Sequence, residues 1–288
     1  MDRESFIKEQ QRKKRIRQRK LRRARFFALV VVLFIIILVV SVSNKPDTKQ
    51  SPENNENITV NDVIYPTPPP TIPDLITAIN KPDGVKECYL TFDDGPTNSI
   101  TTEILDVLRR YDVKATFFTV GTLLEKNPDT ARRVYDEGHL LANHSYSHNY
   151  SNLYADETSF MNEINQTYKL ICDITGDANY PHVFRFPGGG FNSGSHGEAK
   201  QSYKNALAPN NIRYCDWNAL NGDAEGGSPS AEELVQRVKK SSNNKEDIVI
   251  LMHDAATKKT TAESLPEVIE YLKSQGYIFK TLDQAPRF

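Results

Sequence analysis

The sequence predicts an α/β fold with a mostly parallel sheet of about seven strands. From residue 85 onward, short apolar runs that suit strands alternate with segments of helical periodicity, an order typical of βαβ units. A hydrophobic fraction of 38% excludes a mainly disordered chain or a multi-span membrane protein. Seven strands suit a barrel or a doubly wound sheet, and periodicity does not distinguish the two.

The expected strands are short apolar runs, and the expected helices lie between them. Strands are predicted at residues 87–92, 115–120, 140–142, 182–186, 212–216, 248–252 and 277–281. Helices are predicted at residues 99–110, 129–137, 156–174, 197–208, 230–241 and 262–274. Ser99 and Ser230 are expected N-caps, because a side-chain oxygen there can accept from the first free amides. Gly138, Gly176 and Gly276 follow helices, where glycine is typical of the C-terminal cap.

The first 43 residues divide into a basic tail and an apolar run. Residues 1–25 hold twelve Lys and Arg against three acidic residues, and residues 26–43 carry no charge. As a helix the apolar run would be about 26 Å long, the lower end of what crosses a bilayer of roughly 30 Å. Basic residues beside a span favour the cytoplasmic side. We therefore expect a single-pass signal anchor at 26–43 in the cell membrane, with the rest of the chain extracellular; a cleaved signal peptide is the alternative.

Residues 44–84 are expected to be a flexible, Pro-rich extracellular linker. Prolines recur between Pro52 and Pro73 among Asn, Glu, Thr and Lys, a composition that cannot bury a core. A proline-rich ligand for a recognition module is the alternative interpretation. Residues 85–288 then form one folded domain. Because residues 44–288 are net acidic, no nucleic-acid partner is expected, and no obligate protein partner is inferred.

Two adjacent aspartates, Asp93 and Asp94, come at the end of the first predicted strand, directly before Gly95 and Pro96. Neighbouring side chains of a strand point to opposite faces. Both aspartates can therefore serve one site only if the strand ends there, as the Gly-Pro turn signal predicts. The alternative is a solvated turn with an aspartate cap.

Two histidines, His144 and His148, are four residues apart. On a helical turn this spacing puts both imidazoles on one face, which suits two ligands of one metal ion. Two histidines and one aspartate leave coordination positions open, as a catalytic metal needs. An incidental pair is the alternative, because a lone histidine pair of this spacing is common.

Three further motifs follow predicted strands. Arg185 precedes Pro187 and three glycines, Gly188, Gly189 and Gly190, whose backbone amides can come close to a ligand; a flexible turn is the alternative. His253 ends a buried apolar strand and is an acid/base candidate, because sites of α/β folds lie beyond the carboxyl ends of strands.

The third of these motifs is Trp217 with Asp223, which follow the strand predicted at 212–216. Trp217 is either a core residue or a platform for a ligand. The three cysteines, Cys88, Cys172 and Cys215, are expected to pack in apolar surroundings, with one disulfide left open because sequence cannot pair them.

Together and in this order, the motifs resemble those of the polysaccharide deacetylases of carbohydrate esterase family 4, over roughly residues 85–284. The resemblance implies a distorted (β/α) barrel of about seven strands that removes acetyl groups from N-acetylated sugars or acetylated xylan. It implies that Asp94, His144 and His148 bind a divalent metal, usually Zn²⁺ and sometimes Co²⁺ or another transition ion. It also implies that Asp93 is the general base and His253 the general acid.

The resemblance gives the remaining site residues supporting roles. Arg185 would keep Asp93 ionised, and Asp223 would raise the pKa of His253. Backbone amides after Pro187, at Gly188 and Gly189, would stabilise an oxyanion. Substrate contacts are expected from these three residues and from Trp217 and Leu251, the last as a lining of the acetyl pocket.

The sequence departs from the family pattern at three positions. Gly188 stands where the family often has an aromatic residue, so the amide remains while the side-chain wall is absent. Leu220 and Ala224 replace an aspartate and a tryptophan of the fourth motif. These departures affect the acetyl pocket and the sugar platform, and they leave the metal and acid/base set complete.

The combined prediction is a membrane-tethered, metal-dependent deacetylase that acts on acetylated polysaccharide outside a bacterial cell. Its expected substrate is N-acetylglucosamine of peptidoglycan, because an anchor and a short spacer would hold the site within the wall. The alternatives are chitin oligomers, N-acetylmuramic acid and O-acetylated xylan. A non-catalytic surface glycan-binding protein on the same fold is the rival from another class.

Overall fold

The computed structural model describes residues 74–80, 83–191 and 197–286. The predicted basic tail, the anchor at 26–43 and the linker up to residue 73 lie outside these ranges. Within them, no helix combines the length and the apolar character that a membrane crossing needs.

A short helix, α2 (Leu75–Ile79), corrects the linker prediction at its carboxyl end. Leu75 and Ile79 are buried and belong to the main hydrophobic core. Asp74 caps the helix by accepting a hydrogen bond from the Ile76 amide. The folded part therefore includes residues before 85. The spacing of Leu75 and Ile79 puts two apolar side chains on one helical face, a signal that the neighbouring prolines obscured.

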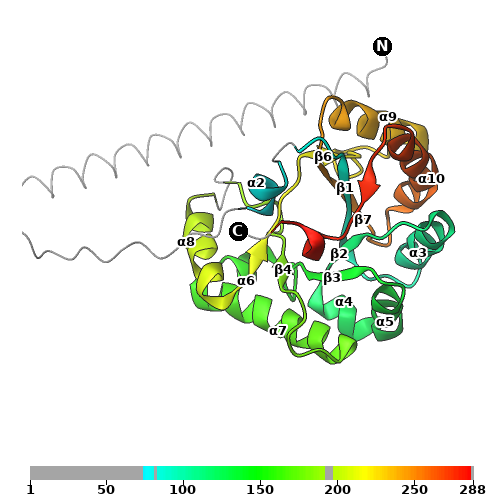
Figure 1. Cartoon of the computed structure of the whole chain (residues 1–288). Helices are drawn as coiled ribbons and strands as arrows, with labels where there is room; N and C mark the ends of the chain where they lie inside the picture. Colours follow the sequence, from blue (N-terminus) through cyan, green and yellow to red (C-terminus); the bar gives the residue numbers. More distant parts are fainter. Residues whose placement is uncertain (1–73, 81–82, 192–196, 287–288) are drawn as a thin grey trace, which may run out of the picture. The chain divides into compact units, whose positions relative to one another are not determined.

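The sheet has eight strands, ordered β5-β4-β3-β2-β1-β7-β6, with β8 also paired to β1 (Figure 1). Every one of these pairings is parallel. The strands are β1 (Glu87–Gly95), β2 (Thr116–Thr119), β3 (Leu140–Asn143), β4 (Val183–Phe184), β5 (Arg213–Tyr214), β6 (Ala219–Leu220), β7 (Ile248–His253) and β8 (Ile278–Phe279). Among the described strands no ladder joins β5 to β6. The result is an open, distorted (β/α) barrel, as expected.

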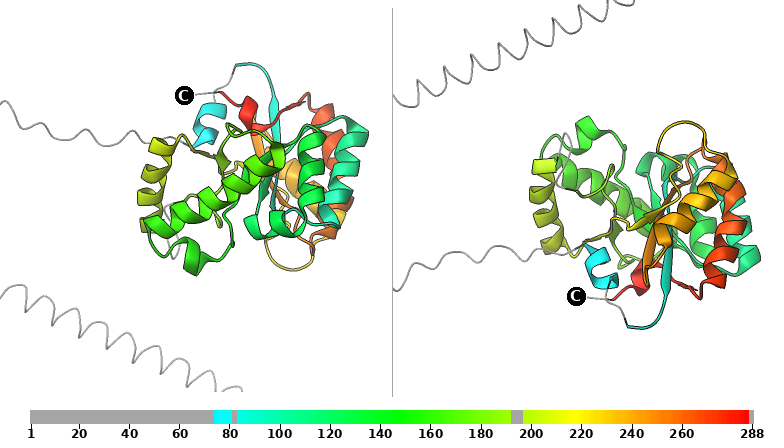
Figure 2. Two further views of the ribbon diagram at one scale, coloured as in Figure 1. Left: turned by 90° about the horizontal axis from the view of Figure 1, so that it is seen from below. Right: turned by 90° about the horizontal axis from the view of Figure 1, so that it is seen from above.

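The helices lie along the outside of the strands, as the side views show (Figure 2). They are α3 (Ile100–Tyr111), α4 (Gly121–Lys126), α5 (Pro128–Asp136), α6 (Tyr150–Leu153), α7 (Glu157–Thr175), α8 (Gly197–Leu207), α9 (Ala231–Ser242) and α10 (Lys259–Ser274). Ser230 caps α9, as predicted, and it forms a capping box with Glu233. Ser99 stands at the N-cap of α3, as predicted, but its side chain makes no capping hydrogen bond there.

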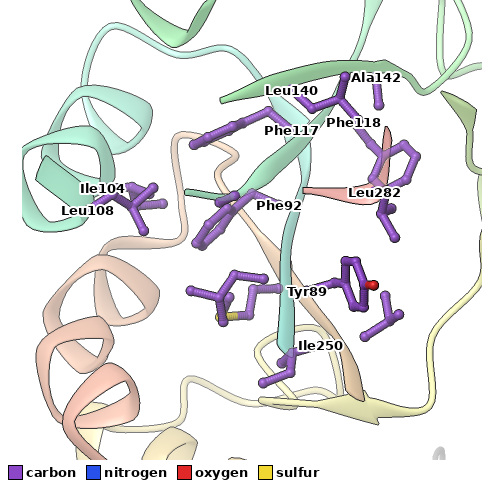
Figure 3. Close-up of a cluster of buried hydrophobic side chains, with 14 of the residues drawn as sticks. Tyr89, Phe92, Ile104, Leu108, Phe117, Phe118, Leu140, Ala142, Ile250 and Leu282 are labelled. Atoms are coloured by element: carbon purple, nitrogen blue, oxygen red, sulfur yellow. The ribbon is translucent and has the colours of Figure 1, made fainter. Parts of the chain in front are cut away.

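The main core lies between the strands and α3, α5, α9 and α10. Phe92 and Phe117, from the neighbouring strands β1 and β2, stack with ring centroids 5.1 Å apart (Figure 3). Fully buried side chains such as these each contribute roughly 1.5–3 kcal/mol of transfer free energy. This packing fixes the central strands, and through them the residues at their carboxyl ends. All three cysteines are free thiols.

Candidate active site

Asp93 and Asp94 lie at the carboxyl end of β1, in the middle of the sheet. The strand continues through Gly95 instead of ending before the pair, which corrects the sequence prediction. Its register with β2 shifts between Asp93 and Gly95, and Asp94 has a φ of 74°. Such a bulge interrupts the alternation of side chains. Both carboxylates can therefore face the same site although they are neighbours in a strand.

His144 and His148 follow β3 in a loop, not on the helical turn that their spacing predicted. The loop backbone is left-handed at Ser145 and His148, with φ values of 70° and 53°. The carboxylate of Glu163, on α7, accepts hydrogen bonds from the amides of Tyr146 and Ser147 at 2.9 and 2.7 Å. These contacts hold the two imidazoles together, with ring centroids 5.1 Å apart.

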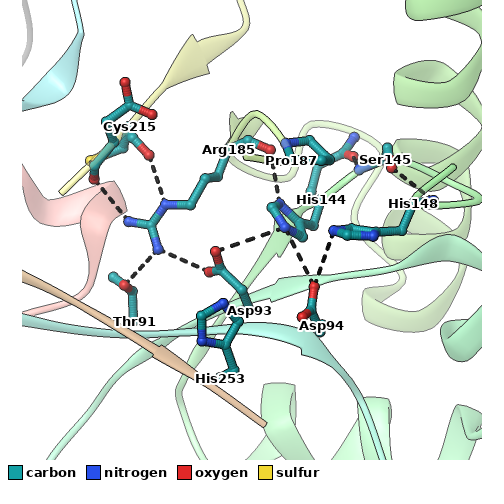
Figure 4. A network of polar contacts seen from close by, with 12 residues as sticks. Thr91, Asp93, Asp94, His144, Ser145, His148, Arg185, Pro187, Cys215 and His253 are labelled. Carbon is teal, nitrogen blue, oxygen red and sulfur yellow. Dashed lines mark hydrogen bonds and ion pairs between the residues drawn. The ribbon is translucent and has the colours of Figure 1, made fainter. Parts of the chain in front are cut away.

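The carboxylate of Asp94 faces both imidazoles (Figure 4). Its Oδ1 atom is 3.6 Å from Nε2 of His144 and 3.2 Å from Nε2 of His148. One ligand atom from each of the three residues lies within 4.8 Å of the others. Oδ1 of Asp94 is buried and has no hydrogen-bond partner among the described residues. Three converging ligand atoms with an unsatisfied buried oxygen fit a divalent cation.

The protonation of His144 agrees with this fit. Its Nδ1 is 2.9 Å from the carbonyl oxygen of Arg185, which can only accept, so Nδ1 donates and Nε2 presents a lone pair. Burial lowers the pKa of His144 to about 3, so the imidazole is neutral near pH 7. A neutral imidazole with an oriented lone pair is the form that binds a metal ion.

Arg185 is completely buried behind the aspartates. Its Nη1 donates to Oδ1 of Asp93 at 2.9 Å and to Oγ1 of Thr91 at 2.7 Å. Nε and Nη2 donate to the carbonyl oxygens of Cys215 and Asp216, both at 2.9 Å. Burial raises the pKa of Asp93, and the charge of Arg185 opposes this rise without cancelling it. Arg185 therefore lowers the pKa of Asp93, which is the predicted direction.

His253 ends β7 and is directly opposite Asp93 in the β1–β7 register. Asp223 holds it twice, since one carboxylate oxygen is 2.7 Å from Nδ1 and the other accepts from the backbone amide at 2.9 Å. Burial lowers the pKa of His253, but the hydrogen bond to Asp223 and the charges of Asp93 and Asp223 outweigh burial, so the pKa is raised. With Nδ1 bonded to Asp223, Nε2 remains for a substrate.

The glycine loop, residues Pro187 to Gly190, follows Arg185 and Phe186. The Gly189 amide donates to the carbonyl of Phe186 at 2.7 Å, and the Gly190 amide donates to the Asp216 carboxylate at 2.7 Å. Neither amide can serve a ligand, which corrects the prediction for Gly189. The exposed Gly188 has no acceptor for its amide among the described residues.

The two remaining predicted contacts are partly exposed. Leu251 and His253 lie on the same face of β7, since they are two residues apart in a strand, and both are partly exposed while Ile250 and Met252 are buried. Trp217 is also partly exposed, and its ring faces Phe191 edge-on at 5.4 Å.

Two sequence comparisons with known proteins indicate the family of this chain. The family model for polysaccharide deacetylases matches residues 80–205. The peptidoglycan-N-acetylglucosamine deacetylase of Bacillus cereus is 32% identical over 209 residues, which are 72% of this chain and 91% of that protein.

The chain belongs to the polysaccharide deacetylase family. Its members are hydrolases, and so is this polysaccharide deacetylase. Peptidoglycan-N-acetylglucosamine deacetylase PgdA of Listeria monocytogenes is 34% identical over 199 residues, 69% of this chain and 38% of that protein. The crystal structure of the catalytic domain of a peptidoglycan N-acetylglucosamine deacetylase from Eubacterium rectale superposes with a TM-score of 0.66 at 33% identity. It covers 73% of this chain and 94% of that one.

Sequence reasoning missed several residues that shape the site of this polysaccharide deacetylase. Thr91 stands in the aspartate motif itself, and Asp216 directly precedes Trp217, yet neither was assigned a role. Asp254, next to His253, is buried beneath the bulge and accepts a hydrogen bond from Thr101. Burial raises the pKa of Asp254 to about 7. Glu163 carried no local signal, because it lies in the middle of α7.

Proposed function

We propose that this chain is a metal-dependent deacetylase that removes N-acetyl groups from cell-surface polysaccharide, above all from N-acetylglucosamine of peptidoglycan. The observation that carries the proposal is the meeting of three metal-binding groups with a buried aspartate and a histidine. Asp94, His144 and His148 form the metal-binding set, and Oδ2 of Asp93 is 3.8 Å from Nε2 of His144. His253 pairs with Asp93 across β1 and β7. Amide hydrolysis needs these functions within one site.

A divalent cation such as Zn²⁺, held by Asp94, His144 and His148, would polarise the acetyl carbonyl and make water easier to deprotonate. Side chains of this protein move the protons. Asp93 has Oδ1 bonded to Arg185, so Oδ2 is the oxygen that accepts the proton of the attacking water. His253, whose pKa is raised by the hydrogen bond to Asp223, donates its Nε2 proton to the leaving amine.

The Gly188 amide is the backbone donor for the oxyanion, the negatively charged carbonyl oxygen that forms when water attacks the acetyl group. It directly follows Pro187, whose carbonyl accepts a hydrogen bond from the Tyr154 hydroxyl at 2.8 Å. The loop is thus fixed on one side while the Gly188 amide stays available. A fixed donor needs no reorganisation as negative charge develops.

Two lines of support favour peptidoglycan over other acetylated glycans. Relatives from Bacillus cereus and Listeria monocytogenes that align over about 70% of this chain are named peptidoglycan-N-acetylglucosamine deacetylases. The basic tail and apolar run of the sequence favour an enzyme anchored in the membrane, with its site in the wall. Chitin oligomers, N-acetylmuramic acid and O-acetylated xylan are the other substrates to compare.

A non-catalytic glycan-binding role fits the structure less well. Binding alone does not require the buried Arg185–Asp93 pair or the oriented His253–Asp223 pair, which are costly to bury. Both pairs are complete, with N–O distances of 2.9 and 2.7 Å.

The test is acetate release from peptidoglycan, chitin oligomers and acetylated xylan, measured side by side with the full chain. We expect release, fastest from peptidoglycan, and none from the Asp93→Asn variant, which keeps the size of the side chain but loses the base. No release from any of the three glycans would refute the proposal. Full activity of Asp93→Asn would refute the role of that residue.

A further inference from the structure

Exposed aromatic side chains gather at the glycine loop. Of the described residues, four large hydrophobic side chains are exposed: Val85, Tyr150, Phe191 and Ile278. Two of these four, Tyr150 at 42% and Phe191 at 47% exposed, border the loop. Large apolar groups on a surface next to a site indicate a binding surface.

The glycine loop carries no side chains at Gly188 and Gly189, and aromatic residues lie close against its backbone there. Gly188 and Gly189 have φ values of 74° and 79°, where other residues are strained. A Cβ atom on Gly188 would lie 3.0 Å from the Tyr150 hydroxyl. A Cβ atom on Gly189 would lie 2.7 Å from the Phe191 ring and 3.0 Å from Trp217. The three aromatic residues therefore surround the loop; we call Tyr150, Phe191 and Trp217 the aromatic rim.

Tyr150 is fixed relative to both the loop that carries His144 and His148 and the glycine loop. It begins α6, whose N-cap Asn149 accepts from the Ser151 amide at 3.0 Å. Its ring centroid is 5.7 Å from that of His148 and 5.8 Å from that of Tyr154. Tyr154 in turn bonds the carbonyl of Pro187. Tyr150 thus stands between a metal-binding residue and the expected oxyanion donor.

We propose that the aromatic rim binds pyranose rings and that Tyr150 is a specificity-determining residue, stacking on the sugar that carries the acetyl group. The proposal rests on the proposed function for the identity of that sugar. The C–H groups on a pyranose face are apolar with a small positive charge, and they complement the negative face of an aromatic ring. Because Tyr150 lies beside His148, it would contact the sugar unit whose acetyl group is removed. Phe191 and Trp217 would contact a neighbouring sugar unit of the glycan.

Trp217 supplies a direct readout, because it is the only tryptophan of the chain. The probe is a tetramer of N-acetylglucosamine, titrated into the full-length Asp93→Asn protein while the fluorescence of Trp217 is followed. Tyr150→Ala and Tyr150→Phe are then compared in this background for Kd and in the otherwise unchanged enzyme for KM and kcat. Tyr111→Ala is the matched control, since Tyr111 lies on α3 and bonds Glu270 of α10.

We expect Tyr150→Ala to raise Kd and KM by about tenfold, the effect of losing one aromatic contact of roughly 1.4 kcal/mol, with kcat within about twofold. Tyr150→Phe keeps the ring, so its Kd and KM should stay within about twofold of the values with Tyr150. The same is expected of the Tyr111→Ala control. Thermal unfolding followed by circular dichroism checks that each variant is folded.

Several outcomes would overturn the proposal. They are an unchanged Kd and KM in Tyr150→Ala, a loss in Tyr150→Phe as large as in Tyr150→Ala, and no fluorescence change with the tetramer in the parent protein. Absence of acetate release from every glycan would instead refute the proposed function. The fluorescence titration would still test the aromatic rim in that case, because it does not depend on turnover.

Discussion

Replacing the buried Arg185 by methionine should destabilise the protein strongly. Methionine keeps an apolar stem of similar length, so the variant mainly removes the guanidinium. The guanidinium makes four hydrogen bonds, to Asp93, Thr91 and the carbonyls of Cys215 and Asp216. Its carbon Cζ also lies 4.1 Å from the centroid of the Phe118 ring. Arg185 is 0% exposed, so all of these contacts are made away from bulk solvent.

The size of the effect follows from the buried ion pair. Breaking such a pair by removing one partner costs about 3–5 kcal/mol, because the other charge stays buried and uncompensated. The three neutral acceptors that lose a donor add to this cost. We therefore expect the free energy of unfolding to fall by at least about 3 kcal/mol, a large part of the roughly 5–15 kcal/mol that stabilises most proteins. Asp93→Asn combined with Arg185→Met should recover about 1 kcal/mol or more, since no charge is then left unpaired.

Urea unfolding of the four proteins of this cycle, in the presence of a chelator, measures these differences. The backbone carbonyl of Arg185, which holds His144, is unchanged in the variant. A loss below about 1 kcal/mol in Arg185→Met, or a double variant less stable than Arg185→Met, would refute the reasoning. If Arg185→Met retains activity, the acidic limb of its kcat/KM–pH profile should move to higher pH. The reason is that Asp93 loses the positive charge that opposes the rise of its pKa.

Three further predictions concern the surrounding residues. In Asp223→Asn the pKa of His253 falls, because burial lowers it once the carboxylate is gone; the basic limb of the kcat–pH profile should move to lower pH, and an unmoved limb would contradict the pairing. Gly95→Ala places a Cβ against the Asp254 carboxylate and should cost about 1–3 kcal/mol, measured by thermal unfolding; an unchanged Tm would be inconsistent with this contact. His144→Ala should lose Zn²⁺ binding in calorimetry, and unchanged affinity would exclude it as a ligand.

The central part of the fold could be predicted because its strands are long apolar runs. Strands β1, β2, β3 and β7 were predicted within three residues at each end. By contrast, β4, β5 and β8 are two residues long where five were predicted, because barrel distortion interrupts pairing without changing local composition. Strand β6 has two residues, too few for a periodic signal.

At the site, the residue types were predictable but their local conformations were not. The spacing of His144 and His148 suggested a helical turn, whereas the loop is shaped by Glu163, which is distant in sequence. Asp94 joins the site through a bulge that a two-residue alternation cannot indicate. Tertiary hydrogen bonds likewise decide which glycine amide is free, since Asp216 takes that of Gly190.

The most direct test of the account is acetate release from peptidoglycan by the full chain before and after its metal ions are removed with a chelator. If Asp94, His144 and His148 hold a divalent cation beside Asp93 and His253, chelation abolishes release and Zn²⁺ or Co²⁺ restores it. Release that continues unchanged in the chelated protein would contradict the account.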